Sequence, residues 1–160
     1  MAKQVPGYFD LLLDLDENWK VIDLQTDYDL KEINIRVEFI RNKGICPYNF
    51  DLCSGHDYTK LRRWRHLDIM DYHTYIECKT PRIIDKQGKV KTMSVPWAKY
   101  NRYTSKFESK VIDLLLAQKN QTKTALFMQC GFRVVNNIIH KSTERGLNRM
   151  NLQDVVGLGK

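Results

Sequence analysis

Residues 33–39 read INIRVEF, and apolar and polar side chains alternate at every step of this stretch. Successive side chains of a β-strand point to opposite faces, so the pattern predicts a strand with one buried and one solvated face. The turn-prone Asp27-Tyr28-Asp29 lies just upstream, and residues 19–27 before it are also strand-like. Two neighbouring strands are therefore expected, at residues 19–27 and 32–40.

Extended sequence continues further along the chain. Residues 46–58, CPYNFDLCSGHDY, are loop-like, and residues 58–95 are mostly extended with a turn at residues 85–88. Before all of these, residues 8–15 predict a short helix.

The last third of the sequence has helical periodicity. Ser105 and Glu108 match a capping box, and apolar residues then recur at helical spacing, which predicts a helix from Ser105 to Gln118. From Thr122 two more helical segments are separated by residues 129–131, an arrangement typical of a helix-turn-helix. The residues expected to face its core are Ala125, Phe127, Met128, Val135, Ile138, Ile139 and Ser142.

The composition is that of a folded, soluble protein: 160 residues, 42% of them apolar and 28% charged. Its longest apolar runs, such as Leu114–Ala117, are far shorter than the roughly 20 residues of a membrane span. We expect no membrane partner and a cytoplasmic location. Four cysteines without a secretory signal then favour reduced thiols or a metal site over disulfides.

The formal net charge of +7 is unevenly distributed. Residues 1–40 carry 4 basic and 9 acidic groups, whereas residues 41–160 carry 22 basic and 10 acidic groups. A field polarised in this way attracts polyanions, and nucleic acid is the leading candidate.

The densest cationic stretch is RRWRHLD, residues 62–68, and 11 cations face 4 acids between positions 59 and 103. Cations on an extended surface can contact phosphates without reading sequence. The expected phosphate ligands are Lys60, Arg62, Arg63, Arg65 and Arg82. The alternative is a solvated sheet face, with Trp64 and Trp97 as core residues in either case.

The second of the two later helical segments carries polar side chains suited to base edges. The candidate base-reading residues are Arg133, Asn136, Asn137 and His140, because Arg suits guanine and Asn suits adenine. A helical hairpin with a merely solvated polar face is the alternative.

Metal and catalytic patterns are weak. Cys46 and Cys53 are separated by six residues, which is wider than a zinc knuckle, so no cofactor is expected and Cys46, Cys53, His56 and Cys78 remain a weak alternative zinc site. His66, His73, Asp68 and Asp71 lack a partner nucleophile, and no catalytic residue is assigned.

Several motifs carry a resemblance to a known family. They are Cys46-Pro47, WRHLD at residues 64–68, Thr80-Pro81-Arg82, VPWA at residues 95–98 and Tyr103-Thr104-x-x-Phe107-Glu108. In this order and spacing, from about residue 19 to residue 158, the sequence resembles the N-terminal part of bacterial insertion-sequence transposases. These proteins have a zinc-ribbon-like domain, a helix-turn-helix and a DDE catalytic domain.

The resemblance implies an α+β fold with a ribbon-like β domain at residues 1–98, a degenerate zinc ribbon, and a helix-turn-helix domain at residues 99–160. It also implies binding to terminal inverted repeats. Three of the four expected zinc ligands are missing, so Trp64, Tyr72, Tyr75 and Trp97 would have to hold the ribbon by packing. The sequence stops at Lys160, where the acidic catalytic region would follow, so this chain is expected not to cut or join DNA. We interpret it as a fragment, a decayed gene product or a free-standing binder.

The function expected from the sequence is therefore sequence-specific binding of double-stranded DNA without catalysis. The expected location is the bacterial cytoplasm, and no small-molecule substrate is expected. The chain could also form a homo-oligomer. The rival hypothesis is a protein-binding module, an inhibitor or assembly factor, that uses the acidic residues 10–32 and exposed aromatic side chains on a partner.

Overall fold

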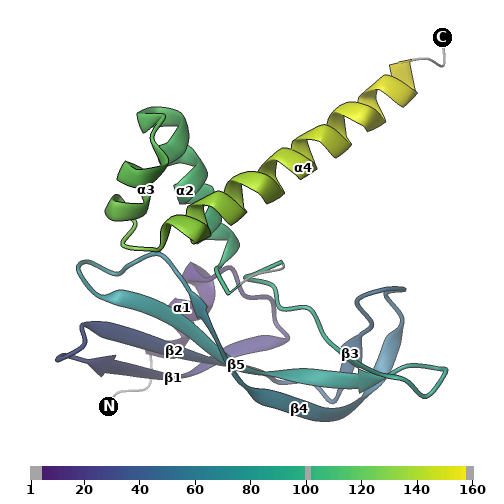
Figure 1. Ribbon diagram of the computed structural model, residues 1–160. Helices are drawn as coiled ribbons and strands as arrows, with labels where there is room; N and C mark the ends of the chain where they lie inside the picture. Colours follow the sequence, from purple (N-terminus) through teal and green to yellow (C-terminus); the bar gives the residue numbers. More distant parts are fainter. Residues whose placement is uncertain (1–4, 100–101, 158–160) are drawn as a thin grey trace. The chain divides into compact units, whose positions relative to one another are not determined.

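The computed structural model describes residues 5–99 and 102–157, with side chains described for residues 7–99 and 102–146. The chain divides into two compact units, Met1–Phe107 and Glu108–Lys160. The first unit contains the β-sheet and one helix, and the second is helical (Figure 1).

A six-stranded mixed sheet dominates the first unit. Its strands are β1 (Trp19–Asp27), β2 (Glu32–Phe39), β3 (Lys43–Ile45), β4 (Leu52–Arg65), β5 (His73–Ile84) and β6 (Val90–Thr92). The order across the sheet is β1-β2-β5-β4-β3, and β6 pairs with β5. Neighbours are antiparallel except β2 and β5, which run parallel.

The prediction of a ribbon-like β module is wrong, although the α+β class holds. All six strands share one sheet that packs on an extensive apolar core, with a second small cluster of Cys46, Cys53 and Ile83, whereas a zinc ribbon is held mainly by its metal. The strands predicted at residues 19–27 and 32–40 are confirmed. The loop predicted at residues 46–58 is too long, because β4 already begins at Leu52. Two irregularities in the β4–β5 register interrupt the alternation that would have marked this strand.

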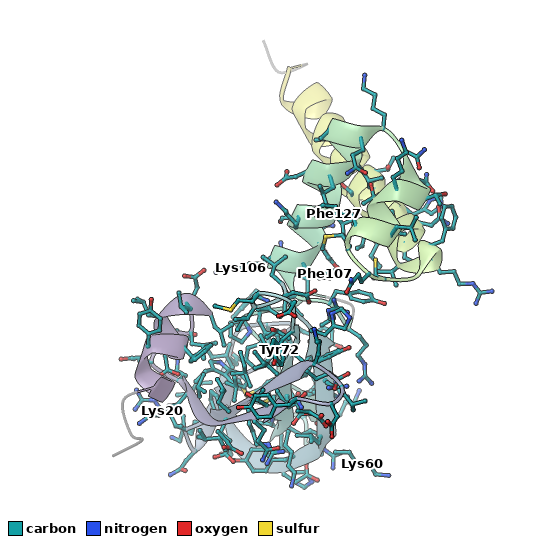
Figure 2. The ribbon with its side chains drawn as sticks, turned by 90° about the vertical axis from the view of Figure 1, so that its left-hand side faces the viewer. Lys20, Lys60, Tyr72, Lys106, Phe107 and Phe127 are labelled. Atoms are coloured by element: carbon teal, nitrogen blue, oxygen red, sulfur yellow. The ribbon has the colours of Figure 1, made fainter. Side chains whose placement is uncertain are left out.

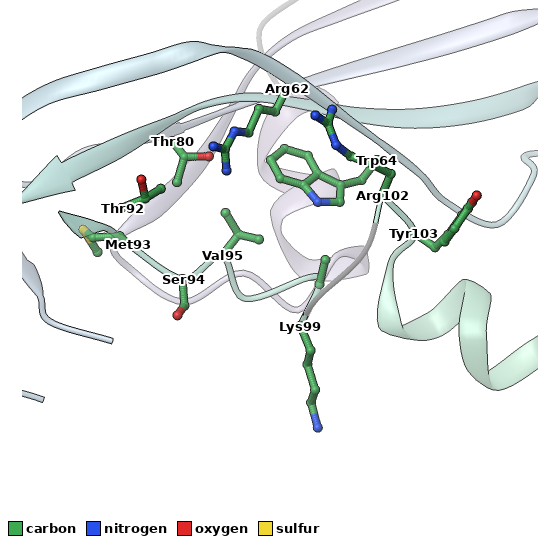
Figure 3. A pocket seen from close by; sticks show the side chains of 11 residues that line it. Arg62, Trp64, Thr80, Thr92, Met93, Ser94, Val95, Lys99, Arg102 and Tyr103 are labelled. Carbon is green, nitrogen blue, oxygen red and sulfur yellow. The ribbon is translucent and has the colours of Figure 1, made fainter. Parts of the chain in front are cut away.

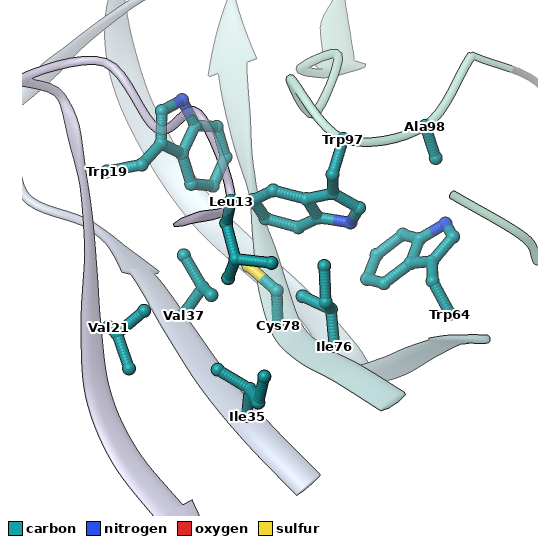
Figure 4. Packing of buried hydrophobic residues seen from close by; sticks show 10 residues of the cluster. All are labelled: Leu13, Trp19, Val21, Ile35, Val37, Trp64, Ile76, Cys78, Trp97 and Ala98. Carbon is teal, nitrogen blue, oxygen red and sulfur yellow. The ribbon is translucent and has the colours of Figure 1, made fainter. Parts of the chain in front are cut away.

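Three tryptophans form the centre of the core (Figure 4). The Trp97 ring lies edge-on to Trp19 at a centroid distance of 5.2 Å and to Trp64 at 5.5 Å. Edge-to-face pairs of this kind add to the stabilisation that comes from burial. Ile35 and Ile76 from the paired strands β2 and β5 complete the layer beneath.

The segment after β6 closes over the sheet through Trp97 and then follows the end of β4. The backbone N–H of Arg65 donates to the Arg102 carbonyl at 2.8 Å, and the N–H of Thr104 donates to the Arg65 carbonyl at 2.9 Å. We call residues 93–99 and 102–104 the strap. Its position is thus fixed by tryptophan packing and by backbone hydrogen bonds.

The helices are α1 (Val5–Leu12), α2 (Ser105–Gln118), α3 (Gln121–Phe127) and α4 (Phe132–Gly157). The predicted bounds of α2 are confirmed. Its cap lies one residue earlier than the predicted capping box, because the Thr104 Oγ1 accepts a hydrogen bond from the Phe107 N–H at 3.2 Å.

In the second unit, α3 and α4 bury small and branched side chains. Ala125, Met128, Val135 and Ile138 are buried as predicted, but Phe127 is 64% exposed, so its assignment to the core is wrong. Asn120 caps α3 by accepting from the Lys123 N–H at 2.9 Å.

The assignment of residues 99–160 to a helix-turn-helix domain is not retained. Residues up to Phe107 belong to the sheet unit, and α4 runs for 26 residues, far beyond a short second helix. A hairpin of two helices carries no DNA-binding signature by itself.

We expect Trp97→Ala to lower the free energy of unfolding of the first unit by about 3–5 kcal/mol, because it removes the ring shared by both tryptophan contacts. Urea titration followed by far-UV circular dichroism measures this change. Leu11→Ala, at a side chain that is 74% exposed in the same unit, should change it by less than about 0.5 kcal/mol. Equal effects of the two substitutions would contradict the central role of the tryptophans.

Candidate nucleic-acid interface

Arg63 lies on the solvent-facing side of the sheet, where it is held by the chain's own residues. Its guanidinium forms an ion pair with Glu32 and a 2.7 Å hydrogen bond to the Asn34 Oδ1. The same group lies 3.5 Å from the centroid of the Tyr75 ring. A cation with this many local partners costs free energy to divert to a phosphate.

Arg65 is even more enclosed, with only 9% of its surface exposed. Its Nη2 lies 2.8 Å from the Asp68 Oδ1 and 2.8 Å from the His73 Nδ1. The charge of Arg65 is therefore compensated inside the fold.

Arg82 is paired at the far end of the same two strands. Its Nε donates to the Asp57 Oδ1 at 2.6 Å, and a second ion-pair contact joins its Nη2 to the same carboxylate. This hydrogen bond holds the pKa of the Asp57 carboxyl below its usual range. Three of the five predicted phosphate ligands, Arg63, Arg65 and Arg82, thus already have an anionic partner.

Lys60 and Arg62 form no ion pair among the described residues. Lys60 is exposed and points away from the sheet (Figure 2). Lys79 on β5 pairs with Leu61 and is exposed on the opposite face of the sheet from Arg62, because Arg62 pairs with the buried Cys78. Arg62 in turn lines a cavity of about 500 Å³ together with Lys99 and Arg102 from the strap.

We call Lys60, Arg62, Lys99 and Arg102 the cationic group. Sequence reasoning placed Lys99 and Arg102 in the basic stretch but did not select them. Their position beside Arg62 depends on the strap, which local sequence does not specify.

In residues 41–107 some charged side chains form ion pairs and others do not. Every carboxylate in this range takes part in an ion pair: Asp51, Asp57, Asp68, Asp71, Glu77 and Asp85. Seven cations of the same range have no ion pair within the part of the chain that the structure describes: Lys43, Lys60, Arg62, Lys79, Lys89, Lys99 and Arg102. The basic excess is thus left on specific side chains.

The predicted base-reading residues share one side of α4 in the second unit. Arg133, Asn137 and His140 are exposed, and Asn136 beside them is half-buried. They lie on the side opposite the buried Val135 and Ile138, since residues three, four and seven positions apart align on a helix. The four side chains therefore form one continuous strip.

The candidate metal ligands do not come together. Cys46 and Cys53 pack with Ile83 in one cluster, whereas Cys78 belongs to the tryptophan core. Burial raises the pKa of the Cys78 thiol to about 12, and burial also raises that of Cys53. Among the described residues, no three His, Cys, Asp or Glu side chains gather as metal ligands would.

Comparison with known proteins identifies no relative. No family model matches the chain, and neither a curated protein nor a solved structure matches it. Within residues 5–99 and 102–157, no helix combines the length and the apolar character needed to cross a membrane.

His66, which follows the cationic stretch, is held neutral at the junction of β4 and the strap. Its Nδ1 lies 2.8 Å from the Thr104 Oγ1, and its backbone N–H donates to the Thr74 carbonyl at 2.8 Å. Burial lowers the pKa of His66 to about 4, and the nearby Lys106 contributes in the same direction.

Because the folded-state pKa of His66 lies below its unfolded value near 6.5, the unfolded chain binds the extra proton first. The stability present above about pH 6.5 should therefore be lost as the pH falls to about 4, by at most about 1.4 kcal/mol per pH unit. Urea unfolding at a series of pH values measures this loss. In His66→Asn the loss over this pH range should be smaller than in the wild type, and an unchanged pH profile would contradict the assignment.

Proposed function

We propose that this protein binds double-stranded DNA through the cationic group. The observation that carries the proposal is the charge balance of residues 41–107, in which all carboxylates are paired and cations remain. Cations without an internal partner gain most from a polyanion, because no existing ion pair has to be broken.

The contacts proposed for phosphate differ from those expected from sequence. Lys60 and Arg62 are kept, Lys99 and Arg102 are added, and Arg63, Arg65 and Arg82 serve the fold. Four cations on phosphates would give a salt slope of about −3.6, which is a loss of about 150-fold in affinity between 50 and 200 mM salt.

Sequence preference, in this proposal, comes from the exposed strip on α4. Arg133 suits guanine, Asn137 suits adenine, and an α-helix fits the major groove. Asn136, which is half-buried, would make at most a partial contact.

The motif resemblance supports the same direction, because the corresponding part of insertion-sequence transposases binds the ends of the element. On this proposal the protein acts on DNA in the bacterial cytoplasm. Its target would be an inverted terminal repeat.

Lys60→Gln should reduce the salt slope by about 0.9 and weaken binding to every duplex alike, because it removes one phosphate contact. Fluorescence anisotropy with a labelled duplex across a salt series measures the slope. Lys20→Gln is the matched control, since Lys20 is an exposed strand cation of the same unit in the acidic part of the sequence. The slope should stay unchanged in this control.

Salt-independent binding of the wild type to duplex DNA, or no binding at 50 mM salt, would contradict the proposal. Tight, salt-independent binding to a protein instead would favour the rival protein-binding module.

Asn137→Ala should weaken binding to a preferred duplex by about 1–3 kcal/mol and leave binding to random duplexes nearly unchanged, because base contacts carry the preference. Selection of preferred duplexes from a random pool, followed by gel-shift titration, measures both affinities. Gln118→Ala removes an exposed side-chain amide from α2 and is the control. If Asn137→Ala lowers the affinity for preferred and random duplexes equally, α4 does not read the base sequence.

A further inference from the structure

The cavity beside β4 has features that phosphate contacts on an open surface do not need. It is a half-open pocket of about 500 Å³ between the sheet and the strap, which is within the size range of small-ligand pockets. Its floor comes from Trp64 and Thr80 on β4 and β5, and its other wall includes Val95 and Ala98 of the strap. A ligand could therefore be held from two sides.

The described charged residues that line the cavity are all cationic. Arg62, Lys99 and Arg102 contribute positive charge, and no carboxylate belongs to the lining among the residues that the structure describes. Figure 3 shows the Arg62 guanidinium extending toward Thr80 and Val95, whereas the Lys99 ammonium group points away from them. Arg62 is thus placed as the inner cation and Lys99 lies at the rim.

A buried hydroxyl group in this cavity lacks a partner. Thr80 is 1% exposed, and its Oγ1 has no hydrogen-bond partner among the described residues. Buried polar groups are almost always hydrogen-bonded, because an unsatisfied one costs free energy. A ligand oxygen accepting from Thr80 and from Arg62 would satisfy this hydroxyl group.

We propose that the cavity binds a single nucleotide, with its phosphate group on Arg62, Arg102 and the Thr80 hydroxyl group and its nucleoside against the apolar wall. Guanidinium groups bind phosphate oxygens with paired, charge-assisted hydrogen bonds. The apolar surface that a sugar and a base would cover comes mainly from the half-buried Met93 and Val95, since Trp64 and Ala98 are only 5% and 7% exposed.

This inference goes beyond the proposed function, because a nucleotide would bind here whether or not the protein binds duplex DNA. The phosphate monoester has two possible sources, a free nucleotide or the 5′-phosphate at the end of a nucleic-acid strand. The chemistry recognised by the cavity is the same in both.

Isothermal titration with dAMP, with adenosine and with inorganic phosphate tests the binding of a free nucleotide. We expect dAMP to bind with a dissociation constant of about 1 mM or lower, which is the affinity of a weak small-ligand site. Adenosine should bind at least about tenfold more weakly, because it lacks the charged group. A single-stranded tetranucleotide with and without a 5′-phosphate tests the other source.

Thr80→Val and Arg62→Met localise the site. Each should weaken dAMP binding roughly tenfold or more, because each removes a hydrogen bond to a charged group. Thr80→Val is nearly isosteric and removes a hydroxyl group that has no partner, so the fold should be preserved, and thermal unfolding checks this. Lys89→Met removes the same charge from an exposed cation that lies outside both the cavity and the cationic group, and it should leave dAMP affinity within about twofold, since its effect would be screened.

Binding of dAMP that depends on Arg62 and Thr80 supports a free nucleotide as the ligand. If dAMP does not bind, and the tetranucleotide binds only when it carries a 5′-phosphate and only when Arg62 and Thr80 are intact, the ligand is a strand end. The inference is overturned if neither dAMP nor the 5′-phosphorylated tetranucleotide binds at about 10 mM, because a site weaker than this would have no useful affinity. Equal binding of dAMP and adenosine, or equal losses in Arg62→Met and Lys89→Met, overturns it as well.

Discussion

The edge-to-face contacts of Trp97 with Trp19 and Trp64 are the interaction on which the rest of the first unit depends. Trp97 lies in the strap, outside the regular strands, so its burial is what draws this segment onto the sheet. The strap then places Arg102 beside β4 through the hydrogen bond between the Arg102 carbonyl and the Arg65 N–H. The cationic cavity therefore exists because an aromatic core closes it, and core stability and surface chemistry are linked.

Basic residues in this protein divide into those that build the fold and those that remain available. Arg36, Glu77, Arg63 and Glu32 form a charge network across β2, β5 and β4, in which Arg63 contacts both carboxylates and Arg36 contacts Glu77. Such cross-strand pairs stabilise a solvated sheet face without leaving net charge. Lys60, Arg62 and Lys99 are different, because they form no ion pair among the described residues. A count of cations along the sequence overstates the charge offered to a polyanion.

The cavity and the strip on α4 carry different side chains and therefore suit different ligands. The cavity offers concentrated positive charge, an unsatisfied hydroxyl group and an apolar wall, and this combination favours a small phosphate ester. The strip offers one cation with amide and imidazole groups along an exposed helix, which suits the edges of stacked bases. Arg62 and Arg102 serve both proposals, so the two activities are separated by Thr80→Val, which affects only the cavity, and by Lys60→Gln, which affects only the duplex contacts.

The sequence by itself determined the elements whose signal is local. The alternation in residues 33–39 marked β2, and the periodicity after Thr104 marked α2 to its last residue, because side-chain period is fixed by backbone geometry. The opposed sides of α4 followed from the same rule. Only the tertiary structure decided that β2 and β5 run parallel, that β4 extends through two irregularities, and which cations are free. Pairing between Arg82 and Asp57, or between Arg63 and Glu32, joins residues that are 25 and 31 positions apart. Such partners are chosen by strand register and packing, which depend on the whole chain at once.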